Sequence, residues 1–243
     1  MGNNDYLRRW NKNKIANLLL TAFFIVSFIE VTAEYNEDMY LIWLTKPLIL
    51  PLLMAYYIRR SAKANVFFSV ALLFCWLANL FFIESTWNYI LLGVVSFLVY
   101  RILVIGIVLK KVKMPSFFPL IIGSIPFLFI YASVAIFTFS TLGDSLYLFL
   151  VQGAFTIFLG GLSLGNYMMT SNKPNRILFV STILFAFNQF VFLLRFYYEE
   201  ANLFQAISMI LFVWAQYLLT KYMLNTEKQK SRYLIVNKLN EVG

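Results

Sequence analysis

The sequence predicts an all-α polytopic membrane bundle of eight transmembrane helices with both termini in the cytoplasm. Composition, the spacing of apolar runs and the placement of charge predict it. Of the 243 residues, 61% are hydrophobic and 13% are charged, and the mean hydropathy is +0.74. A soluble domain is about half apolar and about a quarter charged. The composition therefore indicates a protein whose surface faces lipid.

Eight apolar segments are long enough to cross a bilayer, which takes roughly 20 residues of helix. They lie at 15–31, 40–58, 65–83, 88–109, 117–138, 145–166, 177–195 and 201–222. The loops between them are short, so consecutive helices should be antiparallel neighbours in one domain that spans 1–222. Residues 223–243 form a polar segment that we expect in the cytoplasm.

Charge alternates between the two sides of the predicted bundle. Lys and Arg gather in the N-terminal tail, in the second, fourth and sixth loops and towards the C-terminus. The charged residues of the other loops are all acidic. By the positive-inside rule both termini are cytoplasmic, and the pattern fits a bacterial inner membrane. The net charge of +9 is then a topology signal that favours anionic lipid and disfavours nucleic acid as partner. One alternative is a signal peptide ending near Val31-Thr32-Ala33, whose cleavage would leave seven helices.

The residue types present exclude many chemistries. The chain has no histidine, and Cys75 is its one cysteine. Ser–His and Cys–His catalysis, most catalytic zinc sites and an internal disulfide are therefore excluded. Gly161-Leu162-Ser163-Leu164-Gly165 matches a nucleophile pattern, but it lies in a membrane helix without a base. We expect no metal and no cofactor.

Glycines and prolines predict two local features. Pro47 and Pro51 should kink the second helix and leave carbonyl groups free to bind a partner. Gly161 and Gly165 are spaced so that the sixth helix can approach a neighbour closely.

Polar residues inside membrane helices are the usual indicators of function, because lipid solvates them poorly. Two cations, Lys46 and Arg101, lie at depth, and no carboxylate is expected at comparable depth, although Glu30 is within reach of Lys46. In the functional interpretation they bind a ligand anion such as a lipid phosphate, and this is favoured for Arg101. In the structural interpretation, favoured for Lys46, Lys46 snorkels outward and Arg101 binds backbone carbonyls or aromatic faces. Amides such as Asn79 and Gln216 more often form interhelical hydrogen bonds.

The second helix carries the most specific motif, Thr45-Lys46-Pro47-Leu48-Ile49-Leu50-Pro51-Leu52-Leu53-Met54. It resembles the signature of the YhhN-like family, and weaker similarity continues at 71–74, 96–98, 153–154 and 215–216. The resemblance implies an eight-helix membrane fold. Characterised members are lysoplasmalogenases, which hydrolyse the vinyl-ether bond of lysoplasmalogens, and a carboxyl group suits that chemistry because it can protonate the vinyl ether.

The sequence departs from this family where catalysis is expected. The resemblance places one acid at Asn79, a second at Gly161 and a histidine at Arg101, whereas Lys46 and Gln216 are kept. No other Asp or Glu is predicted deep in a helix, so no replacement acid is evident and the catalytic residues stay unassigned. The enzymatic status is correspondingly open.

Four functions are consistent with these residues. The favoured one is a divergent member that binds a lysophospholipid or ether lipid, with Arg101, Lys46, Asn79 and Gln216 as candidate ligand-binding residues and with hydrolysis lost or altered. The others are an active lysoplasmalogenase with relocated acids, a small transporter built on the proline-broken helix, and a structural bundle without a ligand. The sequence does not predict the oligomeric state.

Overall fold

The computed structural model describes residues 2–84, 86–112, 114–142, 146–194 and 201–240, and within these ranges the only regular secondary structure is helix. Acidic loop residues such as Asp144, Glu199 and Glu200 fall outside the described residues. The helices are α1 (Gly2–Asn36), α2 (Met39–Arg60), α3 (Val66–Phe81), α4 (Trp87–Lys111), α5 (Phe117–Leu142), α6 (Leu146–Met169), α7 (Lys173–Leu194) and α8 (Ala201–Asn240).

Five of these helices are long and apolar enough to cross a membrane. The qualifying spans are Lys12–Asn36, Met39–Arg60, Trp87–Lys111, Lys173–Phe192 and Asn202–Glu227. The apolar part of α3 and the described apolar part of α5, Phe117–Ser133, are shorter. The membrane class predicted from composition is thus supported by helix length as well as by hydropathy.

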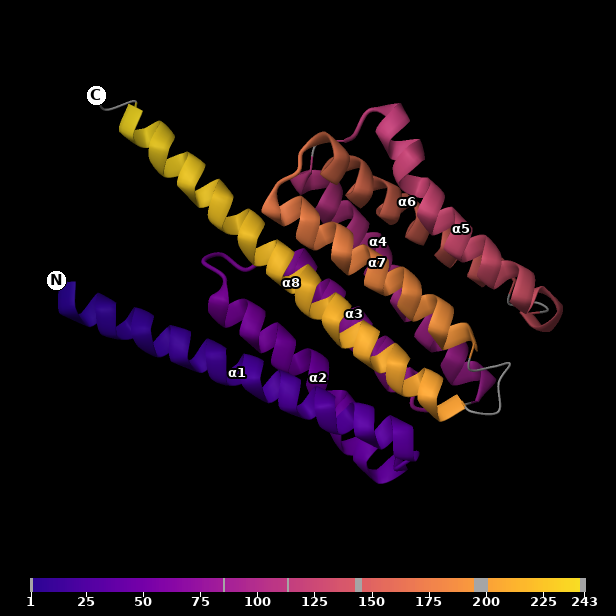
Figure 1. Ribbon diagram of the computed structural model, residues 1–243. Helices are drawn as coiled ribbons and strands as arrows, with labels where there is room; N and C mark the ends of the chain where they lie inside the picture. The colour runs from indigo at the N-terminus through magenta and orange to yellow at the C-terminus, as the bar shows by residue number, and fades with distance from the viewer. Residues whose placement is uncertain (1, 85, 113, 143–145, 195–200, 241–243) are drawn as a thin grey trace.

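The helices pack chiefly as sequential pairs, α1 with α2, α3 with α4, α5 with α6 and α7 with α8. Figure 1 shows α8 running through the middle of the bundle, with the α1–α2 pair on one side and the α5–α6 pair on the other. The N- and C-terminal ends project from the same end of the bundle (Figure 1). Short loops between antiparallel helices produce this arrangement.

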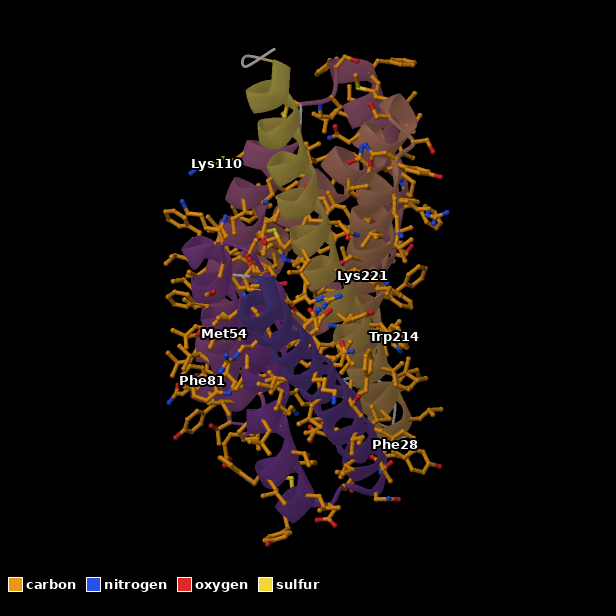
Figure 2. The ribbon with its side chains drawn as sticks, turned by 90° about the vertical axis from the view of Figure 1, so that its left-hand side faces the viewer. Phe28, Met54, Phe81, Lys110, Trp214 and Lys221 are labelled. Carbon is orange, nitrogen blue, oxygen red and sulfur yellow. The ribbon has the colours of Figure 1, made fainter. Side chains whose placement is uncertain are left out.

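The outer surface of the bundle is rich in large apolar side chains, and some charged side chains lie in its otherwise apolar interior. Large apolar residues lie on the outside, and Phe28 is 74% exposed; Figure 2 shows it and Trp214 on the outer surface of the bundle. Charged side chains such as Glu30 and Arg101 are buried inside. Water would disfavour such a surface, whereas hydrocarbon stabilises it.

Helix α1 is longer than the predicted segment 15–31 at both ends. It continues to Asn36 because no glycine or proline interrupts it, and it terminates where Glu37 adopts a positive φ of 55°. The amide of Asp38 then donates to the Ala33 carbonyl oxygen at 3.0 Å, a common way to close a helix. This extension brings Glu34 into the helix.

Helix α8 also runs past its predicted end at residue 222. The polar stretch that follows is rich in good helix formers and has no proline. Glu227 in this extension accepts hydrogen bonds from the hydroxyl of Tyr57 and from that of Ser61, each at 2.6 Å. The start of the predicted tail is therefore attached to α2.

Candidate functional site

Lys46 lies in the first half of α2 with its side chain directed into the bundle. It is 6% exposed. Its ammonium group contacts Glu34 Oε1 directly and lies 3.8 Å from Glu30 Oε1, both on α1. With Thr45 and Gln205, these residues form what we call the Lys46 cluster.

Hydrogen bonds hold the two carboxyl groups in different ways. Glu34 is held at both oxygens, because Lys46 donates to Oε1 and the amide of Gln205 on α8 donates to Oε2. Glu30 contacts the Thr45 hydroxyl through Oε2. Its other oxygen, Oε1, has no hydrogen-bond partner among the described residues. The cluster thus links α1, α2 and α8.

Two expectations about this region are wrong. Lys46 does not snorkel outward, and two carboxylates lie at its depth, since Glu30 and Glu34 are both buried. The reason is the length of α1: the predicted segment ends at residue 31, which leaves Glu34 in the following loop, whereas α1 continues to Asn36. A helix can carry polar residues past its apolar core when a partner on the next helix receives them.

The prolines of α2 do free a carbonyl group, but the protein itself uses it. Pro51 has no amide hydrogen to offer the carbonyl of Pro47 four residues earlier. The indole nitrogen of Trp76 on α3 donates to that oxygen at 2.8 Å. This hydrogen bond fixes α3 against α2 at the point where Lys46 leaves the helix.

Arg101 occupies the middle of α4 and is 4% exposed. Its Nη1 lies 3.5 Å from the Gln152 carbonyl oxygen and 3.4 Å from Gln189 Oε1, and its guanidinium carbon is 5.1 Å from the centre of the Phe97 ring. These hydrogen bonds are long, and both use the same nitrogen. Among the residues described, Arg101 forms no ion pair.

The partners of Arg101 are bound to one another. The Thr156 hydroxyl is 2.8 Å from the Gln152 carbonyl oxygen and 2.9 Å from Gln189 Oε1, and the Gln152 amide donates to the Val94 carbonyl oxygen at 3.0 Å. We call Arg101, Gln152, Thr156 and Gln189 the Arg101 cluster. It draws on α4, α6 and α7 and presents mostly acceptors to the cation.

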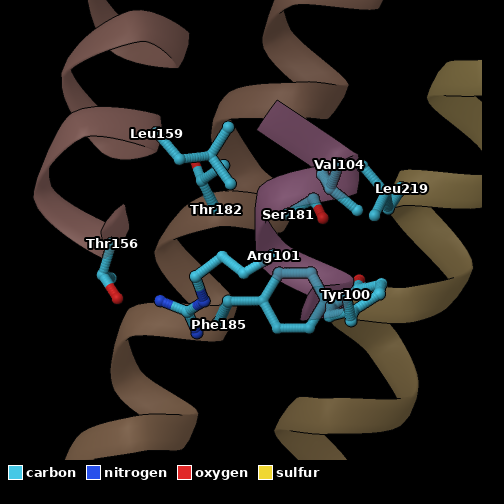
Figure 3. Close-up of a pocket in the computed structure, with 9 residues that line it drawn as sticks. All are labelled: Tyr100, Arg101, Val104, Thr156, Leu159, Ser181, Thr182, Phe185 and Leu219. Carbon is cyan, nitrogen blue, oxygen red and sulfur yellow. The ribbon is translucent and has the colours of Figure 1, made fainter. Parts of the chain in front are cut away.

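A cavity of about 20 Å³ adjoins Arg101. Figure 3 shows its lining, which comes from four helices: Tyr100, Arg101 and Val104 of α4, Thr156 and Leu159 of α6, Ser181, Thr182 and Phe185 of α7, and Leu219 of α8. The volume suits one or two water molecules. Hydroxyl groups and a guanidinium line one small space, an arrangement that can bind an anion or water.

Gln216 and Asn79 belong to a hydrogen-bonded network beside this cavity. Gln216 is fully buried and accepts from the Tyr100 hydroxyl at 3.1 Å, while its amide nitrogen lies 2.9 Å from Cys75 Sγ. The Asn79 amide donates to the Cys75 carbonyl oxygen at 2.9 Å. Gln216 thereby joins α8 to α3 and α4, and Asn79 bonds within its own helix.

Gly161 and Gly165 lie where α6 touches α5. A Cβ atom added at Gly161 would stand 2.9 Å from the Leu120 carbonyl oxygen and would also overlap the Ser124 hydroxyl. One added at Gly165 would stand 2.9 Å from the Pro119 carbonyl oxygen. The position at which the resemblance expects an acid is therefore filled by α5 and has no room for a side chain.

The structure sorts the predicted site residues into separate groups. Arg101 lies next to Tyr100 and so to the network of Gln216 and Asn79, whereas Lys46 is held by α1. Sequence reasoning missed Glu34, Thr45 and Gln205. A signal was present for Glu34, because Ser27, Glu30 and Glu34 recur at helical spacing and so share one face of α1.

The comparison with family models agrees with the motif in α2. The model of the YhhN family matches residues 41–223, from the start of α2 to the membrane-spanning part of α8. The chain belongs to the YhhN family. The match includes Lys46, Asn79, Arg101, Gly161 and Gln216 but begins after Glu30 and Glu34. No curated protein and no solved structure is significantly similar to the chain.

Proposed function

We propose that this YhhN-family protein binds a lysophospholipid or ether lipid inside the membrane and that Arg101 receives the anionic group of that lipid. The proposal rests on a difference between the two buried cations in whether an acidic side chain lies beside them. Lys46 already faces two carboxyl groups, whereas Arg101 meets only uncharged partners within the described part of the chain. A buried cation without a counter-ion favours an anion.

The proposal includes the topology. All eight helices cross the membrane, with both termini in the cytoplasm of a bacterium and the α1–α2 turn on the opposite face of the inner membrane. The alternating charge of the loops supports this orientation. The even number of helices and the shared end of the two termini in Figure 1 are consistent with it.

Hydrolysis by the family's expected route is lost or altered in this proposal. Asn79 carries an amide in place of an acid, and that amide is bonded to Cys75. Gly161 lies against the backbone of α5, so no acid can be accommodated there in the present packing. Gln216 then serves to hold α3, α4 and α8 together around Tyr100, beside Arg101, and Asn79 bonds within α3.

The size of the cavity determines how a lipid could bind. About 20 Å³ admits a water-sized group, such as one phosphate oxygen. Binding of a whole headgroup therefore requires α6 or α7 to move away from α4. The lipid would stabilise this opened state by the difference between its binding free energies for the opened and closed states.

Native mass spectrometry of the protein released from detergent tests the proposal. We expect a phospholipid-sized adduct on the wild type, its loss in Arg101→Leu, and its partial retention in Arg101→Lys, which keeps the charge. Lys110→Leu is the matched control, since it removes one positive charge from the exposed end of the same helix. An equal adduct on wild type and Arg101→Leu would contradict the proposal and favour the structural interpretation of Arg101.

A second candidate, hydrolysis by a relocated acid, is favoured by one observation, the buried carboxyl group of Glu30 beside Lys46. A carboxylic acid in that position could protonate a vinyl ether. Release of aldehyde from a lysoplasmalogen by the purified protein, abolished in Glu30→Gln, would support it. No release above the level of heat-inactivated protein would remove it.

A further inference from the structure

The Thr45 hydroxyl lies within hydrogen-bond distance of two oxygen atoms. Its Oγ1 is 2.7 Å from the Leu41 carbonyl oxygen, one turn earlier on α2, and in direct contact with Glu30 Oε2 on α1. A hydroxyl group has one hydrogen to donate. The carbonyl of Leu41 can only accept. Threonines in helices commonly donate to the carbonyl oxygen one turn earlier, here that of Leu41. The hydrogen between Thr45 Oγ1 and Glu30 Oε2 must then belong to a protonated Glu30, which donates it to Thr45.

The charges in the Lys46 cluster lead to the same assignment. Two carboxyl groups face one ammonium group, so full ionisation would leave a net charge of −1 buried in the bundle. Within the described residues, Lys46 is the one basic side chain that forms an ion pair with these carboxyl groups. Proton uptake removes the excess charge, which is strongly unfavourable in a low-dielectric interior.

The contacts distinguish the two carboxyl groups. Glu34 touches the ammonium group and accepts from Gln205, so both of its oxygens are bonded as those of an ionised carboxylate should be. Glu30 lies 3.8 Å from the ammonium group, and its Oε1 has no hydrogen-bond partner among the described residues. The Ser27 hydroxyl, also buried and without a partner there, lies one turn away on the same helix face.

We propose that Glu30 is the site of a bound, exchangeable proton, held on Oε2 and donated to Thr45, while Glu34 and Lys46 form the adjacent ion pair. Among the described residues, the charged and titratable groups that face Glu30 are Glu34 of α1 and Lys46 of α2, and α8 contributes the uncharged Gln205. The exposed α1–α2 turn, with Glu37 and Asp38, follows Glu34 by less than one helical turn.

Infrared difference spectroscopy of the full chain across a pH series tests this site. The wild type should show the stretching band of a protonated carboxyl group that shifts in D₂O and is lost as the pH rises. Glu30→Gln should lack this band. Glu37→Gln, which removes an exposed carboxyl group nearby, should retain it. A band retained in Glu30→Gln, or no such band at any pH at which the protein stays folded, would overturn the proposal.

Two further variants test the assignment of charge and proton. Glu34→Gln leaves Glu30 as the one carboxyl group beside Lys46, so the band should disappear at a lower pH than in the wild type. Thr45→Val removes the acceptor of the proton and should shift the frequency of the band. Unchanged spectra in both variants would overturn the proposal. Neither result depends on Arg101 or on a bound lipid, so the proton site and the proposed lipid site can fail separately.

Discussion

Lys46 and Arg101 are both buried cations in membrane helices, yet the bundle treats them in opposite ways. Lys46 meets two carboxyl groups, and Arg101 meets two oxygens at 3.4–3.5 Å and an aromatic face. Depth and residue type therefore do not define a ligand site. What matters is whether the protein supplies the counter-charge, because an unneutralised buried charge is the one that gains most from a ligand.

The largest expected effect comes from removing the cation of the neutralised site. Lys46→Met leaves Glu34 without its ammonium partner, and we expect a loss of about 3–5 kcal/mol in the free energy of unfolding, as for other broken buried ion pairs. Thermal unfolding in detergent measures it. The double variant Lys46→Met/Glu34→Gln should recover part of the loss, and a loss no larger than that of Lys110→Leu would contradict the ion-pair assignment.

The α5–α6 contact gives the next largest effect, and it bears on the Arg101 side because α6 supplies Gln152 and Thr156. Gly161→Ala forces a Cβ atom onto the backbone of α5, and overpacking of this kind costs about 1–3 kcal/mol. Gly106→Ala is the matched control, because a Cβ atom there meets nothing within 4 Å. Equal unfolding temperatures for the two variants would show that the close approach is not limiting.

Arg101→Leu should change the free energy of unfolding by no more than about 1 kcal/mol, and it can raise it, because it removes a buried charge that has no counter-ion among the described residues. Comparison of the free energies of unfolding of Arg101→Leu and Lys46→Met tests directly whether the two buried cations differ in counter-charge. Chemical or thermal unfolding of the two variants under the same conditions provides it. A loss in Arg101→Leu as large as that in Lys46→Met would mean that Arg101 is neutralised by a carboxylate.

The smallest effect concerns the turn that ends α1 and so places Glu34. Glu37 has a φ of 55°, a conformation that glycine adopts without strain. Glu37→Gly should raise the free energy of unfolding by about 0.5–1 kcal/mol. Glu37→Ala keeps the strained conformation and should show no gain, which separates the backbone effect from the loss of charge; a gain in Glu37→Ala would identify charge as the cause.

Features that depend on one segment of the chain could be predicted from the sequence, whereas features that depend on contacts between helices could not. Hydropathy located all eight helices, since it reports on a single segment at a time, but it placed the ends of α1 and α8 too early. The helix ends depend on capping and on partners such as Glu227 with Tyr57. The fate of the Pro47 carbonyl could not be read from α2, because its donor, Trp76, belongs to another helix.

The sequence by itself determined the membrane class, the helix positions and the family resemblance through the motif that begins at Thr45. It also determined that an amide and a glycine stand at positions where related proteins are expected to hold acids. All of these are properties of one segment or of composition. Only the tertiary structure decided that Lys46 is neutralised and Arg101 is not, that α5 fills the space beside Gly161, and that Glu30 meets Thr45. These are distances between helices, and a charge acquires its role only from what the neighbouring helices bring to it.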